Sequence, residues 1–161
     1  MEVEMKIRGL TMDPVTQMPI VVLKDINGNT VLPIWVGIFE ANAIALEIEK
    51  VSTPRPMTHD LLKTVLMGLE AGVKKVVVSE LKDDTFYALI WLERDGHLIS
   101  VDSRPSDALA LALRLDCPIF VEDAVLKSSK LTNTVSDKVQ SEELRKWLEN
   151  LNDEDLGRYK M

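Results

Sequence analysis

Two turn signals between β-rich segments constrain the fold of this 161-residue chain more than any other feature. Asn27-Gly28 interrupts the run IVVLKDINGNTVLPIWV, and Asp95-Gly96 follows TFYALIWLER. Both dipeptides favour tight hairpins, because the central positions of such turns must accept positive φ angles. Residues 2–10 alternate apolar with charged side chains, which is the period of a half-buried strand. The sequence therefore predicts antiparallel strand pairs in both halves of the chain.

Helical spacing follows each group of strands. Residues 38–51 place apolar side chains at helical intervals, until the prolines of TPRP interrupt the run. Thr58 is expected to cap a second helix that ends near Gly72. The run ALALALRL after Pro105 predicts a third helix, because alanine is a strong helix former and a poor strand former. This third helix is apolar nearly all round, so we expect it to be buried.

The order of these elements indicates an α+β fold. Further strands are expected at residues 73–81, 85–94, 97–102 and 118–122. Three strands leading to a helix thus occur twice, at 2–50 and 74–116, which indicates two βββα-like units with a mixed β-sheet core. We expect one domain over residues 1–135, followed at 136–161 by a C-terminal helix that begins at Ser141 and a short tail.

The composition is that of a soluble globular protein. Hydrophobic residues make up 46% and charged residues 28% of the chain, and no apolar run approaches the roughly 20 residues of a membrane span. The N-terminus lacks the layout of a secretion signal, so we expect a cytoplasmic protein without a membrane partner. Cys117 is the only cysteine and has apolar neighbours, which predicts a buried, inert thiol. The net charge of −7 argues against a broad basic surface, so phosphate chemistry would need local arginines or bound cations.

Polar residues introduce two of the expected helices, in the segments TPRPMTHD and VDSRPSD. In a purely structural interpretation, Thr58 or Ser106 caps free backbone amides at the helix start. Arg55 and Arg104 would then pair with the aspartates that follow them, or brace the two halves of the fold or a dimer interface. Capping groups are common in proteins, so this interpretation is kept beside the functional one.

The same geometry suits a phosphate site. Free amides at a helix start next to an arginine bind anions, and nearby carboxylates bind Mg²⁺ or Mn²⁺, which bridge to phosphate. Asp102 ends an expected strand and Asp107 lies in the next helical turn, so both are expected to converge on one site. His59 can move protons near neutral pH, whereas His97 is expected to be solvated beside a hairpin. The expected metal ligands are Glu40, Asp60, Asp102 and Asp107.

Four ordered motifs resemble the bifunctional nuclease family: LPIWVGIFEANAIALEIE, RPMTHDLL, VDSRPSDALALALR and CPIFV. The resemblance spans about residues 2–130, and the tail WLENLNDEDLG is similar to that of bacterial members. It implies an α+β fold, an oligomeric protein and an activity on RNA and DNA. The motif positions that it carries over are Glu40, Arg55, Thr58, His59, Asp60, Asp102, Arg104, Ser106 and Asp107.

The leading hypothesis is a metal-dependent nuclease that hydrolyses phosphodiester bonds of RNA or DNA and forms a homo-oligomer. The expected catalytic residues are His59, Asp102, Arg104 and Asp107, and the expected substrate-binding residues are Arg55, Thr58 and Ser106. Aromatic residues make up only 5% of the chain, which leaves few platforms for stacked bases. The alternative is a non-catalytic oligomeric module that binds an anion or a nucleotide at the same helix starts and acts in regulation.

Overall fold

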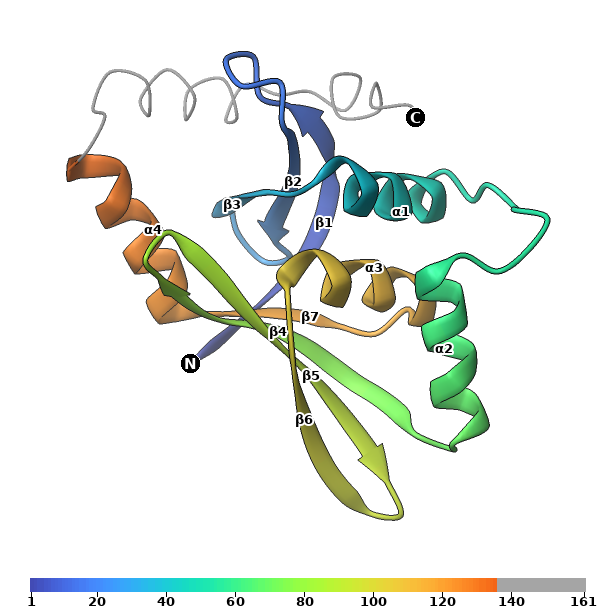
Figure 1. Cartoon of the computed structure of the whole chain (residues 1–161). Coiled ribbons are helices and arrows are strands. Elements are labelled where there is room, and N and C mark those ends of the chain that lie inside the picture. Colours follow the sequence, from blue (N-terminus) through green and yellow to red (C-terminus); the bar gives the residue numbers. More distant parts are fainter. Residues whose placement is uncertain (136–161) are drawn as a thin grey trace.

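The computed structural model describes residues 1–135 (Figure 1). The strands are β1 (Glu2–Met12), β2 (Pro19–Asp25), β3 (Val31–Trp35), β4 (Gly72–Lys82), β5 (Thr85–Arg94), β6 (His97–Ser103) and β7 (Ile119–Glu122). The helices are α1 (Ile38–Ile48), α2 (Thr58–Gly68), α3 (Pro105–Leu115) and α4 (Asp123–Val135). The helix predicted from Ser141 lies outside the described residues.

The strands form one mixed sheet in the order β3-β2-β1-β7-β4-β5-β6. Two antiparallel meanders, β1–β3 and β4–β6, lie on either side of β7. Strand β7 pairs antiparallel with β1 and parallel with β4, where Phe120 lies opposite Val77. Each meander leads along the chain into a helix, α1 or α3, so the predicted α+β class and the repeated order of three strands and a helix are confirmed.

The hairpins lie where they were predicted, but their turn geometries differ. Asp95 and Gly96 adopt positive φ angles of 51° and 78° between β5 and β6, as the two-residue turn requires. The β2–β3 connection is longer. It closes with a hydrogen bond of 2.9 Å from the Asp25 N–H to the Thr30 carbonyl, and neither Asn27 nor Gly28 has a positive φ. Asp83-Asp84 instead forms a tight turn between β4 and β5 that the sequence pattern did not single out.

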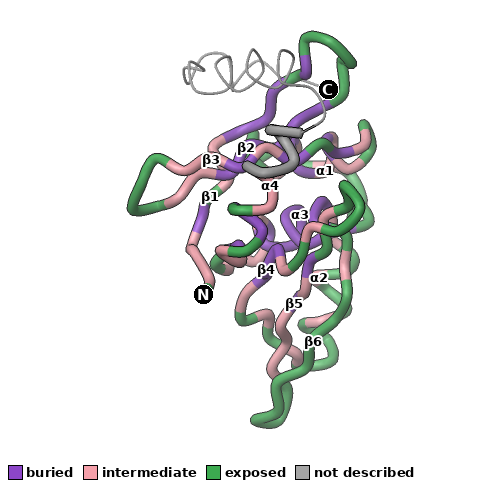
Figure 2. The backbone as a smooth tube through the Cα atoms, turned by 90° about the vertical axis from the view of Figure 1, so that its left-hand side faces the viewer, coloured by how far each residue is buried: buried purple, intermediate pink, exposed green. Residues whose placement is uncertain are grey.

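Helix α3 lies at the centre of the core. Leu109, Ala110 and Leu111 are fully buried, and Ala108 and Ala112 are nearly so, which confirms the predicted burial. The same core cluster includes apolar residues of the sheet, α1 and α4. Figure 2 shows the buried residues gathered around α3 and the β1–β2 pair, while the far end of the β5–β6 hairpin is exposed. The start of α3 therefore leads from the surface directly into the core.

The starts of α2 and α3 differ from the predicted caps. Met57 is the N-cap residue of α2, and Thr58 is already inside the helix. Arg104 is the N-cap residue of α3, and Ser106 lies within its first turn. Neither N-cap residue makes a capping hydrogen bond with its own side chain. The prediction that Thr58 and Ser106 cap these helices was wrong, because the chain enters each helix earlier than the hydroxyl residue.

Two further helix boundaries were not predicted. Helix α2 ends at Gly68 rather than near Gly72, and Glu70 takes the left-handed φ of 57° expected of a residue just past the helix end. Helix α4 begins at Asp123 directly after β7, with no glycine or proline between them to mark the change.

No helix in the described part of the chain is long and apolar enough to cross a membrane.

The thiol of Cys117 is partly rather than fully buried. Its desolvation by the surrounding protein is the main reason that its pKa rises to about 11. The thiol is therefore protonated near neutral pH, which agrees with the predicted lack of reactivity.

Candidate functional site

The first turns of α1, α2 and α3 meet through polar side chains. Glu40 lies in the first turn of α1, His59 in that of α2 and Asp107 in that of α3, while Arg104 is the residue directly before α3. Contacts among these side chains join the three helix starts. We call these four residues the helix-start cluster.

Arg104 bridges two carboxylates within the helix-start cluster. Its Nε donates to Asp107 Oδ2 at 2.8 Å, and its Nη1 donates to Glu40 Oε1 at 2.7 Å. Asp107 is the main reason that the pKa of Arg104 is raised, and Glu40 adds to the effect. The side chain is nevertheless 64% exposed, and Nη2 makes no hydrogen bond within the described residues. The guanidinium thus keeps donors that face solvent while its position is fixed by two ion pairs.

Asp107 also holds the imidazole of His59. His59 Nε2 lies 2.9 Å from Asp107 Oδ1, and the histidine side chain is only 10% exposed. Burial alone would raise the pKa of Asp107, but hydrogen bonds from Arg104 and His59 outweigh it and hold that pKa below the ordinary value of 3.8. An ionised carboxylate only accepts hydrogen bonds, so Nε2 of His59 is the donor and Nδ1 is the nitrogen left for other contacts.

Gly37 leaves the space that Glu40 occupies. It is the N-cap residue of α1, and a Cβ atom at this position would collide with Glu40 Oε2. The carboxylate of Glu40 therefore folds back over the start of its own helix, where it meets Arg104. A glycine is needed here for space, since its φ of −71° is open to any residue.

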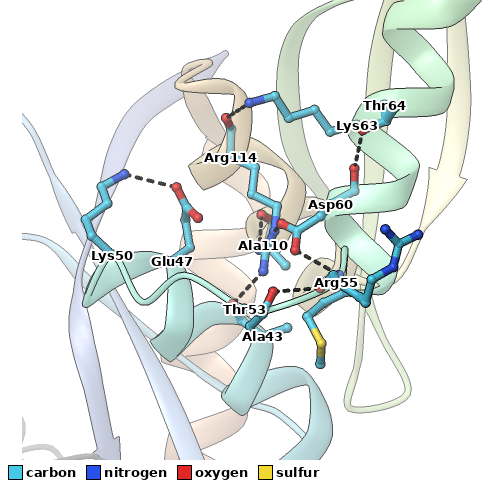
Figure 3. A network of polar contacts seen from close by, with 11 residues as sticks. Ala43, Glu47, Lys50, Thr53, Arg55, Asp60, Lys63, Thr64, Ala110 and Arg114 are labelled. Atoms are coloured by element: carbon cyan, nitrogen blue, oxygen red, sulfur yellow. Dashed lines mark hydrogen bonds and ion pairs between the residues drawn. The ribbon is translucent and has the colours of Figure 1, made fainter.

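Arg114 forms a second ion pair next to the helix-start cluster. Its Nε donates to Asp60 Oδ1 at 2.7 Å, and the arginine side chain is 3% exposed (Figure 3). The other oxygen of Asp60 accepts the Met57 N–H at 2.9 Å; this bond and Arg114 together lower the pKa of Asp60. Sequence analysis missed Arg114. The available signal was the one charge that follows the first turn of the apolar helix expected in the core, since a buried guanidinium needs partners.

Five predicted site residues do not join the helix-start cluster, and one of them, Asp60, is the partner of Arg114. Asp102 is exposed on β6, where it lies opposite Leu89 in the strand pairing. Thr58 is exposed, and Ser106 is buried in α3. Arg55 lies in the loop before α2, in the wall of an open depression of about 360 Å³ that Asp60 and Thr64 also line. The expected convergence of Asp102 with Asp107 does not appear among the contacts of the described residues, because the two oxygens of Asp107 bind His59 of α2 and Arg104.

The four predicted metal ligands are separated by this arrangement. Glu40 and Asp107 are bound to Arg104, Asp60 is bound to Arg114, and Asp102 lies on β6. Across residues 1–135, no group of three histidine, cysteine, aspartate or glutamate side chains is placed to hold a metal ion. In this arrangement three of the four carboxylates bind guanidinium groups rather than surround one divalent cation. The catalytic roles assigned to this chain therefore use no metal.

The fold and the helix-start cluster define an α+β protein with an arginine, a histidine and two carboxylates gathered where three helices begin. Residues 21–134 match the model of the bifunctional nuclease domain. Because this match covers more than half of the chain, the protein belongs to the bifunctional nuclease domain family. The resemblance found in the sequence motifs is thus confirmed.

The relatives include an uncharacterized mycobacterial protein and, at lower identity, plant proteins that are named as bifunctional nucleases. An uncharacterized protein of Mycobacterium tuberculosis is 41% identical over 128 residues, which are 80% of this chain and 76% of the relative. Bifunctional nuclease 1 of Oryza sativa subsp. japonica is 28% identical over 115 residues, 69% of this chain and 35% of that protein. Bifunctional nuclease 1 of Arabidopsis thaliana is 27% identical over 127 residues, 76% of this chain and 39% of that protein. The chain thus spans well under half of either plant protein.

Proposed function

We propose that this protein hydrolyses phosphodiester bonds in RNA or DNA at the helix-start cluster. Its family points to nuclease activity, and the observation that carries the proposal is the exposed guanidinium of Arg104 beside a histidine held by a carboxylate. Such a hydrolysis requires a cationic group that binds the phosphate and a second group that transfers a proton. The net charge of the chain is −7, so a polyanion would have to bind at local cationic groups such as Arg104.

Each member of the helix-start cluster has a role in this proposal. Arg104 binds a phosphate oxygen through its free Nη2, and Glu40 and Asp107 fix the direction of its guanidinium. His59 acts as the general base through Nδ1, because Nε2 is occupied by Asp107. Water attacks phosphorus while His59 takes its proton; the bond from phosphorus to the leaving oxygen breaks, and that oxygen gains a proton from the imidazolium or from solvent.

Metal dependence stays a prediction. A divalent cation that used Glu40 and Asp107 together would have to replace Arg104, which both carboxylates bind. Cleavage assays in Mg²⁺, in Mn²⁺ and in EDTA therefore distinguish two cases. In the first, the helix-start cluster is active with Arg104 bound to both carboxylates; in the second, a cation has replaced Arg104 there. Activity that survives EDTA would favour the first case.

We also propose that copies of the chain associate. Strand β6 is at the edge of the sheet, and Leu98, Ile99 and Val101 on it are exposed. Edge strands usually carry proline, charges or bulges that prevent pairing, and β6 has only Asp102 and His97 near its ends. Antiparallel pairing of two β6 strands would satisfy the open edge and cover these side chains. We propose further that the protein acts in the cytoplasm, where RNA and DNA are available as substrates.

The experiment that tests the proposed function is cleavage of labelled single- and double-stranded RNA and DNA by the full chain. Wild-type protein and His59→Ala are purified in parallel, so that a contaminating nuclease gives equal traces in both. Cleavage by the wild type alone supports the proposal. Tight binding of inorganic phosphate or a nucleotide by calorimetry, with no turnover of any nucleic acid, would replace it with a non-catalytic binding module.

A further inference from the structure

We infer that Arg114 is a positioning residue, which fixes the first turn of α2 and thereby holds His59 against Asp107. The role of His59 in catalysis rests on the proposed function. The placement of its ring does not, and it can be measured separately.

Helix α2 has little apolar packing to hold it in place. Of its residues from Thr58 to Gly68, only His59 is buried, while Leu61, Leu62 and Val65 are among the exposed large side chains. Leu66 is the apolar side chain of α2 that packs against the core, and it is only partly buried. Burial of apolar side chains normally fixes a helix on its neighbours. The position of α2 therefore depends unusually strongly on its polar contacts.

Arg114 supplies the best buried of these contacts. Its guanidinium reaches three helices: Nε donates to Asp60 of α2 at 2.7 Å, Nη1 to the Ala110 carbonyl of α3 at 2.9 Å, and Nη2 to the Ala43 carbonyl of α1 at 3.0 Å (Figure 3). The Arg114 carbonyl in turn accepts a bond from Lys63 Nζ at 3.1 Å, one helical turn beyond Asp60. One residue thus ties α2 to the two helices that carry the rest of the helix-start cluster.

Asp60 transmits this tie to His59. Its two oxygens bind Arg114 and the Met57 N–H, so the carboxylate joins the buried arginine to the backbone at the start of α2. His59 is the adjacent residue and lies between these two bonded positions. A shift of the first turn of α2 would therefore lengthen the 2.9 Å contact from His59 to Asp107.

The chemistry of arginine suits this role. A planar guanidinium with donors in a fixed fork can bind a carboxylate and two carbonyls at once, which a lysine ammonium or a methionine cannot reproduce. Such an ion pair is a weak contributor to stability, and the Asp60 side chain is 36% exposed, so water can hydrate this carboxylate when Arg114 is removed. We therefore expect Arg114 to be needed for geometry more than for folding.

The test uses nuclear magnetic resonance of the full chain labelled with ¹⁵N-histidine. The chain has two histidines, so His97→Gln assigns both sets of ring signals. In the wild type, His59 Nε2 should give the signal of a hydrogen-bonded N–H donor. In Arg114→Met and in the nearly isosteric Asp60→Asn, that signal should shift toward the values of a solvated ring. Arg114→Lys should give an intermediate result.

Leu109→Ala is the matched control, because Leu109 is fully buried in the same helix but is not part of the polar contacts. It should lower the unfolding temperature as much as Arg114→Met or more, with the His59 signals unchanged. Wild-type His59 signals in both Arg114→Met and Asp60→Asn would overturn the inference. If Arg114→Met does not fold, Asp60→Asn decides alone.

Activity provides a second measurement. If the wild type cleaves nucleic acid, Arg114→Met should lower kcat about 10-fold or more with KM changed less than about 2-fold, because the base is displaced while Arg104 stays in place. Unchanged kcat with altered His59 signals would contradict the proposed role of His59 and leave the positioning by Arg114 intact. If the wild type is inactive, the resonance measurement still decides this inference.

Discussion

His59 Nε2 lies 2.9 Å from Asp107 Oδ1, and this hydrogen bond joins the first turn of α2 to the first turn of α3. The two residues are 48 positions apart in the chain. Asp107 uses its second oxygen for Arg104, so one carboxylate fixes both a group for proton transfer and a group for phosphate. The helix-start cluster thus owes its geometry to the way in which α3 lies between α1 and α2.

Arg104→Lys tests the proposed phosphate contact. Lysine keeps the charge but cannot bind Glu40 and Asp107 in a fork and still present a directed donor to substrate. We expect kcat/KM for oligonucleotide cleavage to fall about 10- to 100-fold, since charge-assisted contacts of this kind are worth about 1.5–3 kcal/mol. Arg94→Lys, at the exposed end of β5, is the control and should cleave at the wild-type rate. Cleavage by Arg104→Lys at the wild-type rate would mean that Arg104 acts only through its charge, and equal loss in both variants would mean that the effect does not depend on the position of Arg104.

Gly37→Ala tests the space that Glu40 needs. The added methyl group would push the Glu40 carboxylate away from Arg104. Because the displaced atoms end a flexible side chain, we expect the free energy of unfolding to change by less than about 1 kcal/mol. The KM for substrate should rise, since Arg104 loses one of its two fixing contacts.

The control for this variant is Gly68→Ala. A Cβ atom there meets no other atom within 4 Å, and alanine favours the helix, so stability should rise by about 0.5–1 kcal/mol. The KM should be that of the wild type. A large loss of stability in Gly37→Ala, without a change in KM, would show that Gly37 matters to the fold rather than to the helix-start cluster.

Acid stability tests the ion pairs. The folded-state pKa values of Asp60 and Asp107 are lowered from 3.8. Their stabilisation is therefore fully present above the unfolded value and is lost as the pH falls through the lower folded values. Chemical denaturation of the wild type should show a fall in the free energy of unfolding below about pH 4, and Asp60→Asn should show a smaller fall from a lower starting value. The exposed Asp102→Asn should follow the wild type; parallel curves for all three proteins would rule out this contribution of Asp60.

Association through β6 is tested by light scattering after size-exclusion chromatography. Leu98→Lys with Val101→Lys places charges on the exposed strand and should convert an oligomer to a monomer, because each edge would repel its copy. Val15→Lys changes an equally exposed apolar residue in the β1–β2 loop and should keep the wild-type mass. A monomeric wild type at high concentration would contradict self-association, and an oligomeric double variant would exclude β6 as its interface.

Much of the fold was predictable from local pattern. Period and turn residues placed the strands of both meanders, and the alanine-leucine run placed α3 in the core. The pairing of β7 between β1 and β4 was not predictable, because strand neighbours far apart in sequence leave no local signal. Helix α4 was not predicted, because no glycine or proline separates the end of β7 at Glu122 from the start of α4 at Asp123.

The candidate site was predicted in part. The two Arg-Pro segments did bring His59, Arg104 and Asp107 together with Glu40, but Asp102 remained on β6 although it is only five residues from Asp107. Sequence proximity misled because Pro105 redirects the chain into a helix, and a strand residue and a helix residue then face different ways. Arg114 was missed because two of its partners, Asp60 and the Ala43 carbonyl, come from other helices, which a linear pattern does not show.

The central claim is that His59 moves protons at the helix-start cluster, and the two histidines of the chain allow its most direct test. The measurement is the rate of cleavage of labelled RNA and DNA by the wild type, His59→Asn and His97→Asn, each shown to be folded. We predict that His97→Asn cleaves within about 2-fold of the wild type and that His59→Asn is slower by about 100-fold or more, the usual contribution of a general base. Cleavage by His59→Asn at the wild-type rate would contradict the account.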